Sequence, residues 1–141
     1  MRKDNRYDSL IQYYAEENGF HGKEWFWLKA QIKAESAFNP TAKSGVGAKG
    51  LGQFMPPTWG EWGRGQDVFN PEANIEAQAR YMKWLLGRVT TWDCAFAAYN
   101  WGIGNVLKVW QNSNWKNTLP KETKDYIVRI NQYHEEYLNG N

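Results

Sequence analysis

The sequence contains one cysteine and no long apolar run. Cys94 cannot form an intrachain disulfide, and no Cys-x-x-Cys pattern or Cys/His cluster offers a metal site. A catalytic cysteine would need His21 or His134 to be brought near by the fold. The largely apolar surroundings of Cys94 in residues 92–97 favour a buried structural thiol instead, and we expect no metal and no cofactor. Residues 1–6 are polar and lead into an amphipathic segment, so the sequence shows neither a signal-peptide core nor a membrane span.

The sequence also lacks a basic run. Its lysines and arginines are scattered among acids, and the formal net charge is +2. A phosphate-binding stripe would need clustered basic residues, so we expect no nucleic-acid partner and no membrane insertion. A mildly basic surface suits approach to an anionic polymer, and we expect the protein to act as a monomer.

The length and composition indicate one folded domain covering residues 1–141. Nine Trp, eight Tyr and six Phe are more aromatic residues than one small core normally needs. Some rings are therefore expected at the surface, where they suit sugars. The alternative, that they fill wide gaps between helices, stays open.

Apolar periodicity predicts a mainly α fold without repeats, linkers or long strands. The predicted helices span residues 7–18, 23–37, 70–87, 91–100, 106–110 and 120–138. Pro40 is expected to stop the second helix, and Asn70 with Pro71 to begin the third. Residues 44–52 contain four glycines and are predicted to form a loop or a small irregular β region.

Glu35 is a carboxylate on an apolar helix face. A step of about 100° per residue places it within an arc of roughly 80° that also holds Leu28 and Ile32. Desolvation there would raise the pKa of the carboxyl, as a general acid requires. A role in capping backbone amides or pairing with a lysine is the alternative. The proline stop and glycine-rich loop that follow favour a cleft beside the acid.

Ordered short motifs run through most of the sequence. They are Glu35-Ser36, Asn39-Pro40, Ala42, Ser44, Gly47-Ala48, Gly50-Leu51, Gln53, Met55-Pro56, Asn70-Pro71, Asn74-Ile75, Ala98-Tyr99-Asn100, Gly102, Gly104, Glu122-Thr123 and Tyr126-Ile127. In this order they resemble the motifs of the soluble lytic transglycosylase family, which belongs to the lysozyme-like superfamily. The resemblance implies a single-domain lysozyme-like helical fold with the glycine-rich loop beside the catalytic cleft.

The resemblance also implies a set of site residues. Glu35 would be the catalytic acid/base. The residues that would bind substrate are Ser44, Gln53, Met55, Tyr99, Asn100, Glu122 and Tyr126. Within that set, the resemblance places Tyr99 near the acid and assigns Glu122 to the N-acetyl side of the substrate.

Three positions depart from the family pattern. Gly52 stands where a methionine is usual, which removes one apolar sugar contact. Trp101 replaces a small residue and Ile103 replaces a common proline. Whether Trp101 offers a stacking surface or thickens the core stays open.

The activity implied by the resemblance is cleavage of the β-1,4 bond between N-acetylmuramic acid and N-acetylglucosamine, with closure of a 1,6-anhydro ring. A hydrolase, the muramidase alternative, normally uses two carboxylates. Residues 36–60 contain no acid, which favours Glu35 acting alone, although Glu72, Asp93 or Glu122 could fold into the second position.

A third possibility is a wall-binding or virion structural protein on the same scaffold whose catalytic site is inactive. The retained Glu35 argues against it, because a binding module has no use for an acid on an apolar face. Since no signal peptide is seen, we expect synthesis in the cytoplasm and delivery to the cell wall as a bacteriophage endolysin or virion-associated enzyme. A domain excised from a larger exported or secretion-system protein is the alternative, and it stays open.

Overall fold

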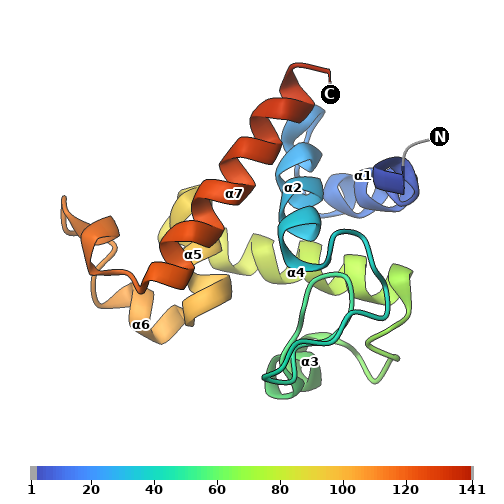
Figure 1. The fold of residues 1–141 in the computed structure, drawn as a ribbon, viewed down its shortest axis with the longest axis horizontal. Helices are drawn as coiled ribbons and strands as arrows, with labels where there is room; N and C mark the ends of the chain where they lie inside the picture. Colours follow the sequence, from blue (N-terminus) through green and yellow to red (C-terminus); the bar gives the residue numbers. More distant parts are fainter. Residues whose placement is uncertain (1–2, 141) are drawn as a thin grey trace.

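The computed structural model describes residues 3–140, most of which lie in helices (Figure 1). The α-helices are α1 (Asp8–Glu17), α2 (Trp25–Ser36), α3 (Pro56–Trp62), α4 (Pro71–Val89), α5 (Trp92–Trp101), α6 (Ile103–Leu107) and α7 (Lys121–Leu138). Three short 3-10 turns are η1 (Lys3–Asn5), η2 (Gly22–Glu24) and η3 (Trp115–Thr118). Within residues 3–140, β structure is limited to two isolated bridges, Lys43 to Lys49 and Lys49 to Phe54. The predicted mainly α fold with a small irregular β region is confirmed.

Two predicted helix starts are confirmed by their caps. The Asn70 side chain accepts from the backbone N–H of Ala73, and the Thr91 hydroxyl accepts from that of Cys94. Each bond satisfies an N–H group that the first helical turn leaves without a partner. The chain therefore enters α4 and α5 where the sequence predicts.

The ends of two helices lie within one or two residues of the predicted positions, but the residues that end them differ from those expected. Helix α2 ends at Ser36, before Pro40, because Ala37 and Phe38 adopt left-handed backbone conformations with φ of 51° and 63°. Phe38 is buried in the core, which offsets the roughly 1–2 kcal/mol that a left-handed non-glycine residue costs. Helix α4 continues through Gly87 to Val89 and ends at the left-handed Thr90.

Two short helices also differ from prediction. Helix α6 covers Ile103–Leu107, because Gly102, with φ of 101°, ends α5 and lets the next helix begin at once. Helix α3 was not predicted. It begins with two prolines, Pro56 and Pro57, in the first turn, where an N–H group would have no helical partner.

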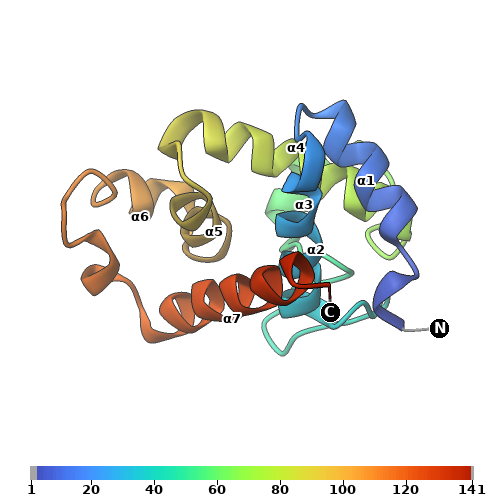
Figure 2. The ribbon, with the colours of Figure 1, turned by 90° about the horizontal axis from the view of Figure 1, so that it is seen from above.

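Helix α2 is the centre of the molecule. It packs along α7 and is crossed by α4, which also contacts α1 and α5 (Figures 1 and 2). Most of the largest fully buried apolar side chains come from α1, α2, α4, α5 and α7; they include Ile11, Leu28, Ile32, Ile75, Met82, Leu85, Phe96 and Ile130. Cys94 is buried, as expected, and burial raises the pKa of its thiol. Among residues 3–140, no helix is both long and apolar enough to cross a membrane.

The glycine-rich loop between α2 and α3 lies on one side of this helical core (Figure 1). The side-chain amide of Asn74 on α4 ties this loop to the segment between α3 and α4. The Asn74 oxygen accepts from the Gly52 N–H at 2.7 Å, and its nitrogen donates to the Val68 carbonyl at 2.8 Å. The loop is thereby fixed against the helix that crosses beneath α2.

Candidate active site

The carboxyl group of Glu35 lies in the last turn of α2, on the same helix as the fully buried Leu28 and Ile32. The residue is only partly exposed. Burial raises the pKa of Glu35 to about 8, although the hydrogen bond from Tyr126 and the charge of Arg129 lower it. The expected rise in the pKa is thus present, and burial is its cause.

A carboxyl with a pKa of about 8 is mostly protonated at neutral pH. It can therefore donate a proton to a leaving oxygen without first taking one from solvent. Tyr126 of α7 donates its hydroxyl proton to Glu35 Oε2 over 2.7 Å, which leaves Oε1 as the oxygen that is free of this bond.

Helix α7 carries Glu122, a predicted site residue, and contacts a second one, Asn100 of α5. Glu122 is exposed in the first turn of α7, and its charge raises the pKa of Glu35. The Thr123 hydroxyl donates to Asn100 Oδ1 at 2.8 Å and so ties the end of α5 to the start of α7. Asn100 thus supports the frame of the site with its oxygen.

Tyr99 lies close to the acid without bonding to it. Burial raises the pKa of the Tyr99 hydroxyl well above its ordinary value, and the charge of Glu35 raises it further. The Tyr99 hydroxyl donates to the Gly52 carbonyl at 2.7 Å, and its ring packs against Phe54 and Tyr81. Its proton is therefore held by the backbone of the glycine-rich loop.

Gly52 is required by this contact. A Cβ atom added at Gly52 would lie 2.8 Å from the Tyr99 hydroxyl oxygen and 3.0 Å from Asn74 Oδ1. The usual methionine could not enter without moving Tyr99. Trp101 and Ile103, the other two departures, are partly buried and pack against the core, which favours the core role for Trp101.

The remaining predicted site residues belong to the loop. Ser44 accepts from the backbone N–H groups of Val46 and Ala48, and Gln53 donates to the carbonyls of Ala42 and Gly50. Met55 is 40% exposed and stands at the start of α3. Within residues 3–140, no hydrogen bond joins these three predicted residues to Glu35. Ser44 and Gln53 shape the loop, whereas Met55 leaves an apolar side chain at the surface.

Two residues that sequence reasoning missed lie directly behind the acid. Gln31 and Gln78 are fully buried, and Gln31 donates to the Tyr126 hydroxyl at 2.9 Å. Their positions in the sequence could have indicated them. Gln31 precedes Glu35 by one helical turn, and Gln78 lies among the buried residues of α4.

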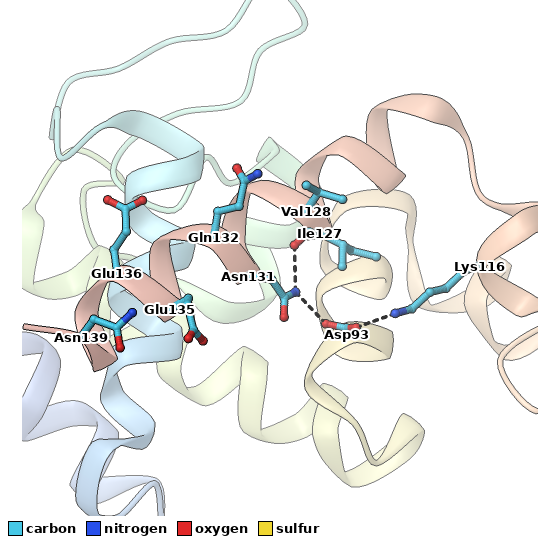
Figure 3. A pocket seen from close by; sticks show the side chains of 9 residues that line it. All are labelled: Asp93, Lys116, Ile127, Val128, Asn131, Gln132, Glu135, Glu136 and Asn139. Carbon is cyan, nitrogen blue, oxygen red and sulfur yellow. Dashed lines mark hydrogen bonds and ion pairs between the residues drawn. The ribbon is translucent and has the colours of Figure 1, made fainter. Parts of the chain in front are cut away.

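A hollow of about 680 Å³ lies elsewhere, between α5, η3 and α7 (Figure 3). Its lining includes Asp93, whose carboxylate accepts from Lys116 at 2.8 Å and from Asn131 at 2.9 Å. None of the predicted site residues lines it. Its central polar groups are already paired with one another, so we do not assign it to substrate.

The fold and the site together define a helical, lysozyme-like protein with a desolvated carboxylic acid at the end of its central helix. The family model described as "Transglycosylase SLT domain" matches residues 10–121. The chain therefore belongs to the transglycosylase SLT domain family, and the family prediction is confirmed.

Curated relatives carry related names. The chain is 29% identical over 135 residues to membrane-bound lytic murein transglycosylase D of Escherichia coli (strain K12), a match covering 74% of this chain and 29% of the relative. It is 33% identical over 147 residues to membrane-bound lytic murein transglycosylase F of Alteromonas mediterranea, covering 91% and 30%. The chain thus spans less than a third of the length of these relatives.

Solved structures share the fold. An inactive mutant of lytic transglycosylase Slt from Pseudomonas aeruginosa superimposes with a TM-score of 0.82 at 28% identity, over 96% of this chain and 25% of that chain. The 70-kDa soluble lytic transglycosylase of Escherichia coli gives 0.81 at 26% identity, over 97% and 25%. The present chain corresponds to about a quarter of each.

Proposed function

We propose that this chain cleaves the glycan strands of peptidoglycan as a lytic transglycosylase, with Glu35 as its acid/base. The observation that carries the proposal is the desolvated Glu35 carboxyl, whose pKa of about 8 keeps it protonated at neutral pH. Membership of the transglycosylase SLT domain family supports the same activity. The net charge of +2 suits an anionic polymer as substrate.

The proposed reaction uses Glu35 twice. The neutral acid first gives its proton to the glycosidic oxygen that leaves with N-acetylglucosamine, and the C1–O bond of N-acetylmuramic acid breaks. The resulting Glu35 carboxylate then takes the proton of the C6 hydroxyl as that oxygen bonds to C1. The acid is restored, the 1,6-anhydro ring closes, and no water is consumed.

The positions of the other acids support this route over hydrolysis, which normally needs a second carboxylate about 5–10 Å from the first. Glu72 accepts a hydrogen bond from Tyr14, and Asp93 is paired with Lys116. Among the described residues, Glu122 is the acid whose charge raises the pKa of Glu35. Glu122 is therefore the acid that we would assign to a muramidase, which is the second candidate function.

Mass spectrometry of muropeptides released from purified peptidoglycan tests the proposal. We expect products that end in 1,6-anhydro-N-acetylmuramic acid. Products heavier by one water, with reducible ends, would identify a hydrolase, and their loss in a Glu122→Gln variant would assign the second carboxylate. A folded protein that binds the wall and releases no muropeptide would support the wall-binding alternative.

Delivery by a bacteriophage stays a prediction within this proposal. The relatives described above come from bacteria and bear the names of murein transglycosylases. One catalytic domain over residues 1–141 and a monomeric state also remain predictions. So do the sugar-binding roles of Ser44, Gln53, Met55, Tyr99, Asn100, Glu122 and Tyr126.

A further inference from the structure

A line of buried hydrogen bonds leads from α4 through α2 to the acid. Gln78 Nε2 donates to Gln31 Oε1 at 2.7 Å, and Gln31 Nε2 donates to the Tyr126 hydroxyl at 2.9 Å. Tyr126 in turn donates to Glu35 Oε2 at 2.7 Å. Gln31 and Gln78 are fully buried, and Tyr126 is 1% exposed, so water does not compete for these bonds.

The direction of the line is fixed at its inner end by a backbone group. Gln78 Nε2 also lies 3.1 Å from the carbonyl oxygen of Leu28, which can only accept. The amide nitrogen of Gln78 must therefore face Leu28 and Gln31. Gln31 consequently turns its oxygen toward Gln78 and its nitrogen toward Tyr126.

This direction constrains the tyrosine. The Tyr126 hydroxyl has one proton, and the N–H of Gln31 already points at its oxygen. The hydroxyl must donate to Glu35, because it cannot present its proton to Gln31. Among the described residues, the buried oxygen of Gln78 finds no hydrogen-bond partner, which is a cost of this orientation of the amide.

We propose that Gln31 and Gln78 are positioning residues that oblige Tyr126 to donate to Glu35 Oε2, so that the neutral acid carries its proton on Oε1. A protonated carboxyl accepts best through its carbonyl oxygen and donates through the other. With Oε2 held as the acceptor, Oε1 is the oxygen that gives up the proton. The link from this arrangement to catalysis rests on the proposed function, whereas the hydrogen-bond direction does not.

Other charged or titratable groups also act on Glu35. Glu122 and Arg129 act on it from α7, and the charge of Glu35 in turn raises the pKa of Tyr99 on α5. A test of the line must therefore change Gln31 while leaving these groups in place. Gln31→Met does so, because it replaces the amide with an apolar side chain of similar size next to Met82, whose sulfur Gln31 contacts at 3.6 Å.

Without Gln31 as a donor, the Tyr126 hydroxyl is free to rotate and to accept the proton of Glu35. This exchanges one hydrogen bond of the neutral acid for another, whereas the Glu35 carboxylate loses a donor that Gln31 had oriented and polarised, so the pKa of Glu35 should rise. We would measure this by NMR titration of protein labelled with ¹³C at the glutamate side-chain carboxyl, with the Glu35 signal assigned from a Glu35→Gln sample. The measurement needs no substrate, so a failure of the proposed lytic activity would leave it intact.

The control is the same substitution in a Tyr126→Phe protein. There the tyrosine hydroxyl is absent, and Gln31→Met should leave the pKa of Glu35 unchanged. An equal shift in both backgrounds would show a general packing effect and would overturn the proposal, as would an unchanged pKa in a folded Gln31→Met protein. If Gln31→Met does not fold, Gln78→Met serves instead. That substitution removes the donor that orients the Gln31 amide. We expect the same rise in the pKa of Glu35 when Tyr126 is present and no rise in the Tyr126→Phe protein.

Kinetics supply the catalytic readout. With soluble glycan fragments, Gln31→Met should lower kcat about two- to tenfold, the range that one misdirected hydrogen bond supports, and leave KM unchanged. A change in KM alone would place Gln31 in substrate binding and would contradict a positioning role.

Discussion

Replacing Glu35 by glutamine should make the protein more stable, and by an amount that grows with pH. The ordinary pKa of a glutamate carboxyl is 4.5, and in the folded protein burial raises the pKa of Glu35 to about 8. Between these pH values the folded state holds a proton that the unfolded state has lost. Stability therefore falls as pH rises through this range, and the contribution of the Glu35 proton to stability is fully lost above the folded pKa.

The size of the effect follows from the pKa difference. Each pH unit in that interval corresponds to 1.36 kcal/mol, so full desolvation gives a total of about 5 kcal/mol. Solvent reaches the partly exposed side of Glu35, and we therefore expect about 3–5 kcal/mol. A glutamine does not titrate and still offers Tyr126 an acceptor oxygen, so the variant avoids this loss.

Thermal and urea unfolding of the parent and Glu35→Gln, followed by circular dichroism from pH 5 to pH 9, measures the difference. We expect similar stability near pH 5 and an advantage for the variant near pH 9, of roughly 10 °C in Tm for a domain of this size. The exposed Glu17→Gln is the matched control and should stay within about 0.5 kcal/mol of the parent throughout.

A constant difference between Glu35→Gln and the parent across this pH range would refute the reasoning. It would mean that the folded protein does not disfavour the Glu35 carboxylate, and the physical basis for a general acid would be lost. Wall lysis by the folded variant should fall by about 10²–10⁴-fold, the range for loss of general acid–base catalysis.

Three further predictions concern the same site. Clearing of cell-wall suspensions should decline as pH rises past about 8, because the Glu35 carboxylate cannot protonate the leaving oxygen; activity that rises steadily to pH 10 would contradict this. Tyr99→Phe leaves the buried Gly52 carbonyl without its donor and should lower the free energy of unfolding by about 1–3 kcal/mol, measured in urea; unchanged stability with lost activity would instead assign the hydroxyl to substrate. Gly52→Ala places a Cβ 2.8 Å from that hydroxyl and should cost about 1–3 kcal/mol, whereas Gly60→Ala in α3, with open space around its Cβ, should stabilise by up to about 1 kcal/mol.

The features that the sequence predicts well are those decided over one helical turn. The caps of α4 and α5 are examples, because the side chains of Asn70 and Thr91 bond to N–H groups three residues ahead. The apolar face that carries Glu35 is another, since helical geometry alone places it with Leu28 and Ile32. Local spacing is sufficient for each of these.

The features that were wrong or missed are set by distant contacts. Helix α3 has prolines and a glycine among its seven residues, a poor local propensity, and it is held by packing of Trp59 on Phe54 and of Trp62 on Tyr81. The early end of α2 depends on where Phe38 is buried. Neither the packing of α3 nor the burial of Phe38 can be predicted from the spacing of apolar residues.

The candidate site divides in the same way. Glu35 can be found from one helix, but its hydrogen bond to Tyr126 joins residues 91 apart in sequence, and Tyr126 was named only through the family resemblance. Gln31 and Gln78, which are 47 residues apart, match no motif considered. A glutamine in a helix is ordinarily a surface residue, so its type alone gives no reason to place it behind the acid.

The opposing effects on Glu35 suit a group that must work in both directions. Burial alone would push its pKa further up, and the hydrogen bond from Tyr126 and the charge of Arg129 bring it back to about 8. In the proposed reaction, an acid with a still higher pKa would release its proton to the leaving oxygen less readily. One with an ordinary pKa would be ionised before substrate arrived, and as a carboxylate it would take the C6 proton less readily. A pKa near the working pH serves both steps. Tyr126 therefore offsets part of the rise in pKa that burial causes at Glu35, which explains why a donor that lowers the pKa lies beside an acid that depends on a raised one.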